Sequence, residues 1–219
     1  MKNGLQTIRR FAVALIAVWA VPAGAVLVQE VNVNPNQVVS ISVSGFSSSS
    51  GSFSGSVYAG VVNLLVDGKP MSGFCIDPFH FSSSSALQFQ YAPLSSGPKV
   101  PMGDEKAKLI SNLWSIGYAD ALTNADKAAG LQIAIWEVVG GDNFTLSNPL
   151  VDYGAGQLIS AAKIYNGPVT PLIALKGPVN GQDYVVAVPD GGSTLILLGT
   201  TFLGLMHLRT RREWAPAIL

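Results

Sequence analysis

The stretch that decides the fold is SVYAGVVNLLV at residues 56–66, followed by Asp67-Gly68 and then by MSGFCI at residues 71–76. The first segment is rich in β-branched and other apolar residues, which is typical of a strand. Asp-Gly is a common two-residue connection between antiparallel strands, so the three parts together predict a β-hairpin. Cys75, near the end of the second strand, is the only cysteine of the chain.

Further strands are predicted on both sides of this hairpin. The segment VVSISV at residues 38–43 alternates between apolar and polar side chains, as a half-buried strand does. Shorter strands are expected at 86–91, 169–175 and 183–188. Serine-rich composition predicts loops at 47–54 and 82–85.

The middle of the chain has helical periodicity instead. One helix is predicted from residue 105, with Gly117 ending it, because its apolar residues share a face: Leu109, Ile110, Leu113 and Trp114. A second helix is expected at 125–139, capped by Thr123 or Asn124, and a third at 157–165. Strands, then helices, then strands predict a mainly β domain, a sandwich or a barrel, with an α-helical insert.

The N-terminus has the features of an export signal. Lys2, Arg9 and Arg10 precede a short apolar segment, and Ala23-Gly24-Ala25 is a small-residue cleavage site. We therefore expect a signal peptide over residues 1–25, read by the Sec export machinery. A retained N-terminal anchor is the alternative.

The C-terminus has three parts in a fixed order: a turn-rich motif, an apolar segment and a basic cluster. They are Val188-Pro189-Asp190-Gly191-Gly192-Ser193, residues 194–208, and Arg209 with Arg211 and Arg212. The apolar segment predicts a transmembrane helix, and the arginines predict that its end is cytoplasmic. Residues 26–187 would then form an extracellular domain, with 188–212 as the sorting and membrane segment and 213–219 as a cytoplasmic tail.

This order of parts resembles the VPDSG-type C-terminal sorting signals, which are relatives of the PEP-type signals. Gly191 stands where the consensus has its serine. The resemblance implies processing by an exosortase-like membrane protease, and a location at the surface of a Gram-negative cell envelope. An ordinary C-terminal membrane anchor is the alternative.

Composition excludes several classes of function. The 13 basic and 13 acidic residues give a net charge of zero with no basic patch, so nucleic acid is not an expected partner. One cysteine and two histidines do not make a metal site of the usual Cys/His kind, and no metal or cofactor is predicted.

A lone cysteine in an exported protein has no disulfide partner, so it calls for another role. The second predicted helix carries Gln132 within LQIAIW at residues 131–136. A thiolate held against that glutamine can attack the side-chain amide, expel ammonia and leave an internal thioester, which is an acyl donor. Trp136 and Phe74 are expected to keep water from the bond, and His80 or Asp77 is a candidate proton carrier.

Three short motifs resemble those of bacterial surface thioester domains, which occur in Gram-positive adhesins. They are Phe74-Cys75-Ile76-Asp77, then Gly117-Tyr118 at the end of a helix, then Gln132, Ala134 and Trp136 within 131–136. The resemblance implies a β-rich fold with a helical subdomain and a Cys75–Gln132 cross-link. It also implies a single covalent attachment to a surface amine or hydroxyl of a protein or glycan, without enzymatic turnover. The exosortase-type anchor and the lack of a stalk depart from that family.

Two other functions fit the same residues. If Cys75 is a small buried hydrophobe, the chain is a non-covalent envelope or matrix protein that uses a Ser/Gly-rich β surface. A cysteine hydrolase would instead need His80 as a base, oriented by a third group.

Overall fold

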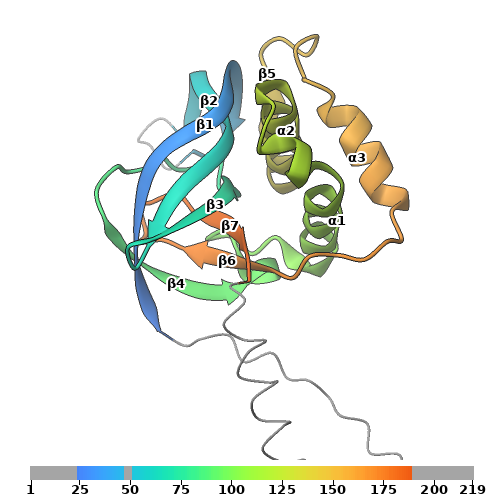
Figure 1. The fold of residues 1–219 in the computed structure, drawn as a ribbon. Helices are drawn as coiled ribbons and strands as arrows, with labels where there is room; N and C mark the ends of the chain where they lie inside the picture. Colours follow the sequence, from blue (N-terminus) through green and yellow to red (C-terminus); the bar gives the residue numbers. More distant parts are fainter. Residues whose placement is uncertain (1–23, 47–50, 189–219) are drawn as a thin grey trace, which may run out of the picture.

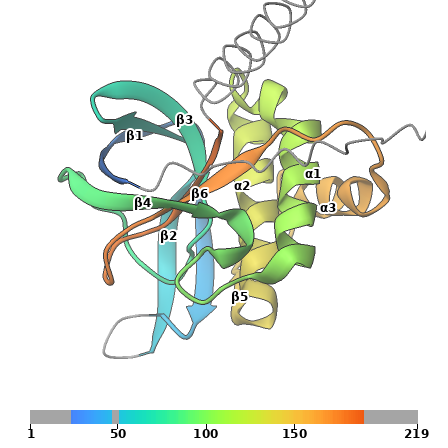
Figure 2. The ribbon, with the colours of Figure 1, turned by 90° about the horizontal axis from the view of Figure 1, so that it is seen from below.

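The computed structural model describes residues 24–46 and 51–188, which form one sheet with helices gathered on one side of it (Figure 1; Figure 2). The strands are β1 (Ala25–Ser44), β2 (Ser52–Val66), β3 (Lys69–Cys75), β4 (Leu87–Pro93), β5 (Phe144–Leu146), β6 (Leu172–Lys176) and β7 (Tyr184–Ala187). The helices are α1 (Gly103–Ala121), α2 (Ala125–Gly140) and α3 (Ala155–Ile164), with short 3₁₀ turns η1 (Leu94–Ser96) and η2 (Gly141–Asn143).

The sheet closes on itself as a barrel. Its strand order is β2-β3-β7-β6-β4-β1-β5, and β1 pairs in addition with β2. All pairs are antiparallel. The prediction of a mainly β domain with a helical insert is therefore confirmed, and of the two predicted architectures the structure has the barrel. The hairpin is also as predicted, with β2 and β3 joined through Asp67-Gly68.

Strand β1 is far longer than the predicted segment 38–43, and two irregularities interrupt it. Its register against β2 shifts between Glu30 and Asn32 and again between Val33 and Asn36. Each shift is a bulge that increases the local twist, which lets one strand pair with β4 at one end and with β5 at the other. The predicted loop at 47–54 is wrong at its end, since residues 52–54 belong to β2.

One prediction about the motif residues, that Gly117 ends a helix, is wrong. Helix α1 does not end at Gly117 but continues through Tyr118 to Ala121. Gly117 is buried inside the helix and faces the Leu131 side chain of α2, with room for a Cβ between them, so it does not act as a cap. Asn124 does cap α2, because its side chain accepts hydrogen bonds from the backbone N–H groups of Asp126 and Lys127.

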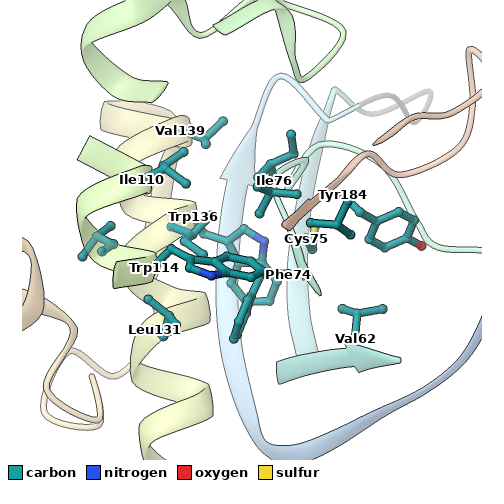
Figure 3. Packing of buried hydrophobic residues seen from close by; sticks show 14 of the residues in the cluster. Val62, Phe74, Cys75, Ile76, Ile110, Trp114, Leu131, Trp136, Val139 and Tyr184 are labelled. Carbon is teal, nitrogen blue, oxygen red and sulfur yellow. The ribbon is translucent and has the colours of Figure 1, made fainter. Parts of the chain in front are cut away.

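An aromatic cluster joins the helices to the barrel. Trp114 and Tyr118 stack with ring centroids 4.1 Å apart, and Phe74 of β3 meets Trp114 edge-on at 5.7 Å. Figure 3 shows Phe74 beside Trp114, and Cys75 beside Tyr184 on the neighbouring strand. Adjacent residues of a strand point to opposite faces, so this packing of Phe74 turns Cys75 toward the interior of the barrel.

Close approach of the turn that precedes α3 makes Gly130, on α2, sensitive to substitution. A Cβ at Gly130 would lie 2.3 Å from the backbone carbonyl oxygen of Tyr153, whereas one at Gly117 would meet only Leu131 side-chain atoms at 3.5 Å. We expect Gly130→Ala to lower the free energy of unfolding by about 1–3 kcal/mol. Gly117→Ala should leave it unchanged or raise it by up to about 1 kcal/mol. Urea unfolding of both variants measures this, and equal stability would contradict the contact.

Candidate functional site

The structure brings Cys75 and Gln132 into direct contact. The Cys75 backbone N–H donates to Gln132 Oε1 at 2.9 Å, and Gln132 Nε2 donates to the Cys75 carbonyl oxygen at 2.8 Å. Both residues are buried, with exposed fractions of 2% and 1%. The side-chain amide is thus held at the residue that carries the thiol, by two hydrogen bonds shielded from water.

This contact arises where strand pairing stops. Pairing between β3 and β2 ends at Gly73, two residues before Cys75, while β3 continues beside β7 as far as the pair Cys75–Tyr184. A buried backbone N–H and C=O left without partners is costly. The Gln132 amide supplies both a donor and an acceptor, so it takes the place of the missing strand and fixes α2 against the barrel.

The surroundings of the sulfur keep the thiol neutral. Burial raises the pKa of Cys75 well above its usual value, and the charge of Asp77 raises it further. The Asp77 backbone N–H, 3.3 Å from Sγ, and the Trp136 indole N–H both lower that pKa in part. Trp136 Nε1 is buried with no regular hydrogen-bond partner among the described residues. A buried N–H in that position is available to negative charge that develops on the sulfur.

A pocket of about 330 Å³ leads to this pair from the surface, and Cys75, Gln132 and Trp136 lie in its wall. Phe46, Phe53 and Phe81 also line it; their rings contact one another with centroids 4.7–5.3 Å apart. Phe81 is 58% exposed, so the pocket opens to solvent on its aromatic side. Its size suits a small ligand or the end of a long side chain.

A second group of charged residues lies beside the pocket. Lys99 Nζ is 3.3 Å from Asp77 Oδ2 and 3.3 Å from Asp183 Oδ1, and it also donates to the Gly181 carbonyl oxygen. His80 Nδ1 lies 2.8 Å from Asp77 Oδ2, and the His80 ring lines the pocket. Burial raises the pKa of Asp183 above its usual value. The Asp77 carboxylate is therefore occupied by Lys99 and His80.

The other predicted motif residues have packing roles. Ile76 and Ala134 are fully buried, and Tyr118 stacks on Trp114 and meets Phe74 edge-on. Glu30, which lines the pocket, and Tyr184, which bonds to Glu30, are among the residues that were not singled out from the sequence. The signal for Glu30 was available, since it continues the alternation of Val26 and Val28 and so falls on the inward face of a strand.

The predicted terminal segments lie almost wholly outside the described residues. These are the signal peptide, the sorting residues Pro189–Ser193, the apolar segment 194–208 and Arg209, Arg211 and Arg212. Val188 is described, and its backbone N–H donates to the Pro171 carbonyl oxygen at 2.9 Å. Within residues 24–46 and 51–188, no helix is long and apolar enough to cross a bilayer, and no three His, Cys, Asp or Glu side chains gather as metal ligands.

Comparison with known families identifies the C-terminal motif. Residues 187–212 match the model of the VPDSG-CTERM motif, which confirms the predicted type of signal. No curated protein matches the chain.

Three solved structures are similar to this chain at low sequence identity. One is the N-terminal thioester domain of a surface protein from Clostridium perfringens, at 12% identity and a TM-score of 0.41, covering 68% of this chain and 98% of that one. Another is the N-terminal domain of the Streptococcus pyogenes pilus tip adhesin Cpa, at 14% identity and a TM-score of 0.43, covering 77% of this chain and 99% of that one. The third is the thioester domain of the Staphylococcus aureus TIE protein, at 14% identity and a TM-score of 0.41, covering 76% of this chain and 79% of that one.

Proposed function

We propose that Cys75 and Gln132 form an internal thioester that attaches this protein covalently to a nucleophile on another surface. The observation that carries the proposal is the pair of hydrogen bonds that hold the Gln132 amide on Cys75. In the first step Sγ attacks the amide carbon Cδ. The S–C bond forms, the C–N bond breaks, and Nε2 leaves as ammonia with the thiol proton. The Cys75 N–H on Oε1 stabilises the oxyanion that develops during the attack.

The second step uses the pocket. An amine or hydroxyl enters along the aromatic wall and attacks the thioester carbon, so that Gln132 becomes an amide or ester of the target and Cys75 is released as a thiol. The acyl group of Gln132 stays bonded to the target, so the thioester is not regenerated. The protein therefore acts once and does not turn over as an enzyme would. Burial of both partners limits hydrolysis before a target arrives.

The C-terminal motif supports a location at the cell surface. On this proposal residues 1–25 direct export by the Sec machinery and residues 26–187 form the extracellular domain. Residues 188–212 hold the domain in the membrane until an exosortase-like protease processes it, and residues 213–219 form a cytoplasmic tail.

One observation favours the cysteine hydrolase as a second candidate. His80 is oriented by Asp77 and lines the same pocket as Cys75, as a general base would. The geometry argues against it, because among the described residues His80 bonds to Asp77 and makes no hydrogen bond to the Cys75 sulfur, as a base must to its nucleophile. Non-covalent matrix binding gains little support, since hydroxyls of the serine surface bond to each other, as Ser42 and Ser54 do at 3.0 Å.

Mass spectrometry of the intact mature protein tests the proposal. We expect a mass lower by one ammonia than the sequence requires. Methylamine should then add one molecule at Gln132 and expose one alkylatable thiol, and Cys75→Ala should abolish both changes. A full sequence mass together with a free Cys75 thiol would exclude the thioester. Turnover of a model ester that is lost in His80→Ala would establish the hydrolase.

A further inference from the structure

An acidic side chain faces the interior of the barrel close to the thiol. Val26 and Val28 of β1 point inward and are buried, and Glu30 is the next residue on that face. The register shift follows immediately, with Val31 as the extra residue relative to β2. Bulges often re-aim a side chain next to an active site. Here the bulge ends the inward run of β1 at a half-buried carboxylate that lines the pocket with Cys75 and Gln132.

Tyr184 fixes this carboxylate. Its hydroxyl donates to Glu30 Oε2 at 2.7 Å, from a side chain that is 2% exposed. Burial raises the pKa of the Tyr184 phenol far above its usual value, so the phenol remains a donor. Tyr184 is also the β7 residue opposite Cys75 in the sheet register, and Figure 3 shows the two side by side. The strand pair that positions the thiol therefore positions the group that holds Glu30.

We propose that Glu30 is the proton carrier of the capture step, accepting the proton of the incoming nucleophile and delivering it to the Cys75 sulfur. The inference rests on the proposed thioester. When a primary amine attacks the thioester carbon, an N–C bond forms and the nitrogen becomes positively charged. The Glu30 carboxylate takes one proton from that nitrogen, and the C–S bond breaks with its electron pair on sulfur. Glu30 then returns the proton to the thiolate, so charge and atoms balance.

The contacts of Asp77 favour Glu30 over this carrier predicted from sequence, and the burial of Cys75 shows why a carrier is needed. The Asp77 carboxylate is 1% exposed and already contacts Lys99 and His80, so it is not free to exchange a proton with a ligand. The thiolate is a poor final state in this site, because burial raises the pKa of Cys75. A leaving sulfur must therefore be protonated, and Glu30 lies in the same pocket wall.

The test measures thioester formation and capture separately, on the purified full-length protein with methylamine as the probe. Intact mass before the amine is added reports formation, and the rate of adduct growth reports capture. We expect Glu30→Ala to form the thioester but to capture methylamine about 100-fold more slowly or worse. Sodium formate should restore part of the rate, and sodium chloride at the same concentration should not.

Tyr184→Phe and a charge control complete the experiment. Tyr184→Phe keeps the ring and the carboxylate but removes the hydrogen bond, so it should slow capture less and leave the methylamine concentration at half-maximal rate unchanged. Glu137 is a half-buried carboxylate of α2 that lies outside the pocket. The variant Glu137→Gln should therefore form the thioester and capture methylamine at the wild-type rate.

Several results would overturn the inference. One is capture at the wild-type rate in Glu30→Ala, and another is slow capture that formate does not rescue. If Glu30→Ala fails to form the thioester, the Tyr184→Phe variant is the test instead. An unchanged capture rate in Tyr184→Phe rejects Glu30 as the proton carrier. A wild-type protein that never loses ammonia refutes the thioester itself, which is a separate outcome.

Discussion

Replacing Gln132 by alanine should cost about 3–5 kcal/mol in the free energy of unfolding, measured in a Cys75→Ala background where no cross-link can form. The change leaves the backbone N–H and C=O of residue 75 buried without partners, and each such group costs about 1–3 kcal/mol. Loss of the buried side-chain methylenes adds a cavity. Urea or guanidinium unfolding of the two proteins gives the difference.

Gln37→Ala is the matched control for this prediction. Gln37 also makes a side-chain hydrogen bond, to Asp126 Oδ1 at 2.7 Å, but its contact is exposed. We expect a loss of about 1 kcal/mol or less there. A loss at Gln132 no greater than at Gln37 would show that its amide does not pair with the end of β3.

The second large effect is expected for Lys99→Met. Lys99 is the cation shared by Asp77 and Asp183, which are 1% and 0% exposed. Removing one partner of a buried ion pair leaves uncompensated charge, which destabilises by about 3–5 kcal/mol. Lys176→Met is the control, because Lys176 bonds only the Ser96 carbonyl oxygen among the described contacts and leaves no buried carboxylate behind.

The Lys99→Met effect should depend on pH with a definite sign. Burial raises the pKa of Asp183 in the folded protein, so Asp183 takes up a proton there at a higher pH than in the unfolded chain. A raised acid pKa favours the folded state at low pH, and that advantage is lost as the pH rises through the raised value. Lys99 lowers that pKa in part, so its removal raises the pKa further. The loss caused by Lys99→Met is therefore largest at neutral pH and shrinks as the pH is lowered and Asp183 takes up a proton in both proteins. A loss that grows on acidification would contradict the assignment.

Local patterns in the sequence predicted most elements, because hydrophobic period and turn residues are local signals. The hairpin of β2 and β3 and the Asn124 cap both follow such rules. The first half of β1 was missed, since its two bulges interrupt the alternation that marks a strand. Gly117 was expected to end a helix, but α1 continues through it to Ala121, because packing against α2 stabilises the helix more than one glycine weakens it.

The candidate site likewise combines residues that the sequence predicted with residues that only the structure revealed. Cys75 and Gln132 were linked by reasoning about what a lone thiol and an amide can do, and the fold brings them into contact. Glu30 and Tyr184 come from β1 and β7, which are far apart in the sequence and are joined only by the closure of the barrel. No local pattern marks such a pair, so the pocket had to be seen in three dimensions.

The closed strand order bears on how such domains tolerate crowding. β1 bonds to both β2 and β4 and so closes the ring of six strands, but the β1–β2 hairpin extends beyond that ring. β2 pairs with β3 only over Val62–Val66, so residues 52–61 pair in the sheet with β1 alone among the described strands. Open edges are where neighbouring molecules add strands to one another and aggregate. Where many copies are packed side by side on a cell, this extended hairpin, and not the closed ring, is the part of the sheet that neighbouring molecules could reach.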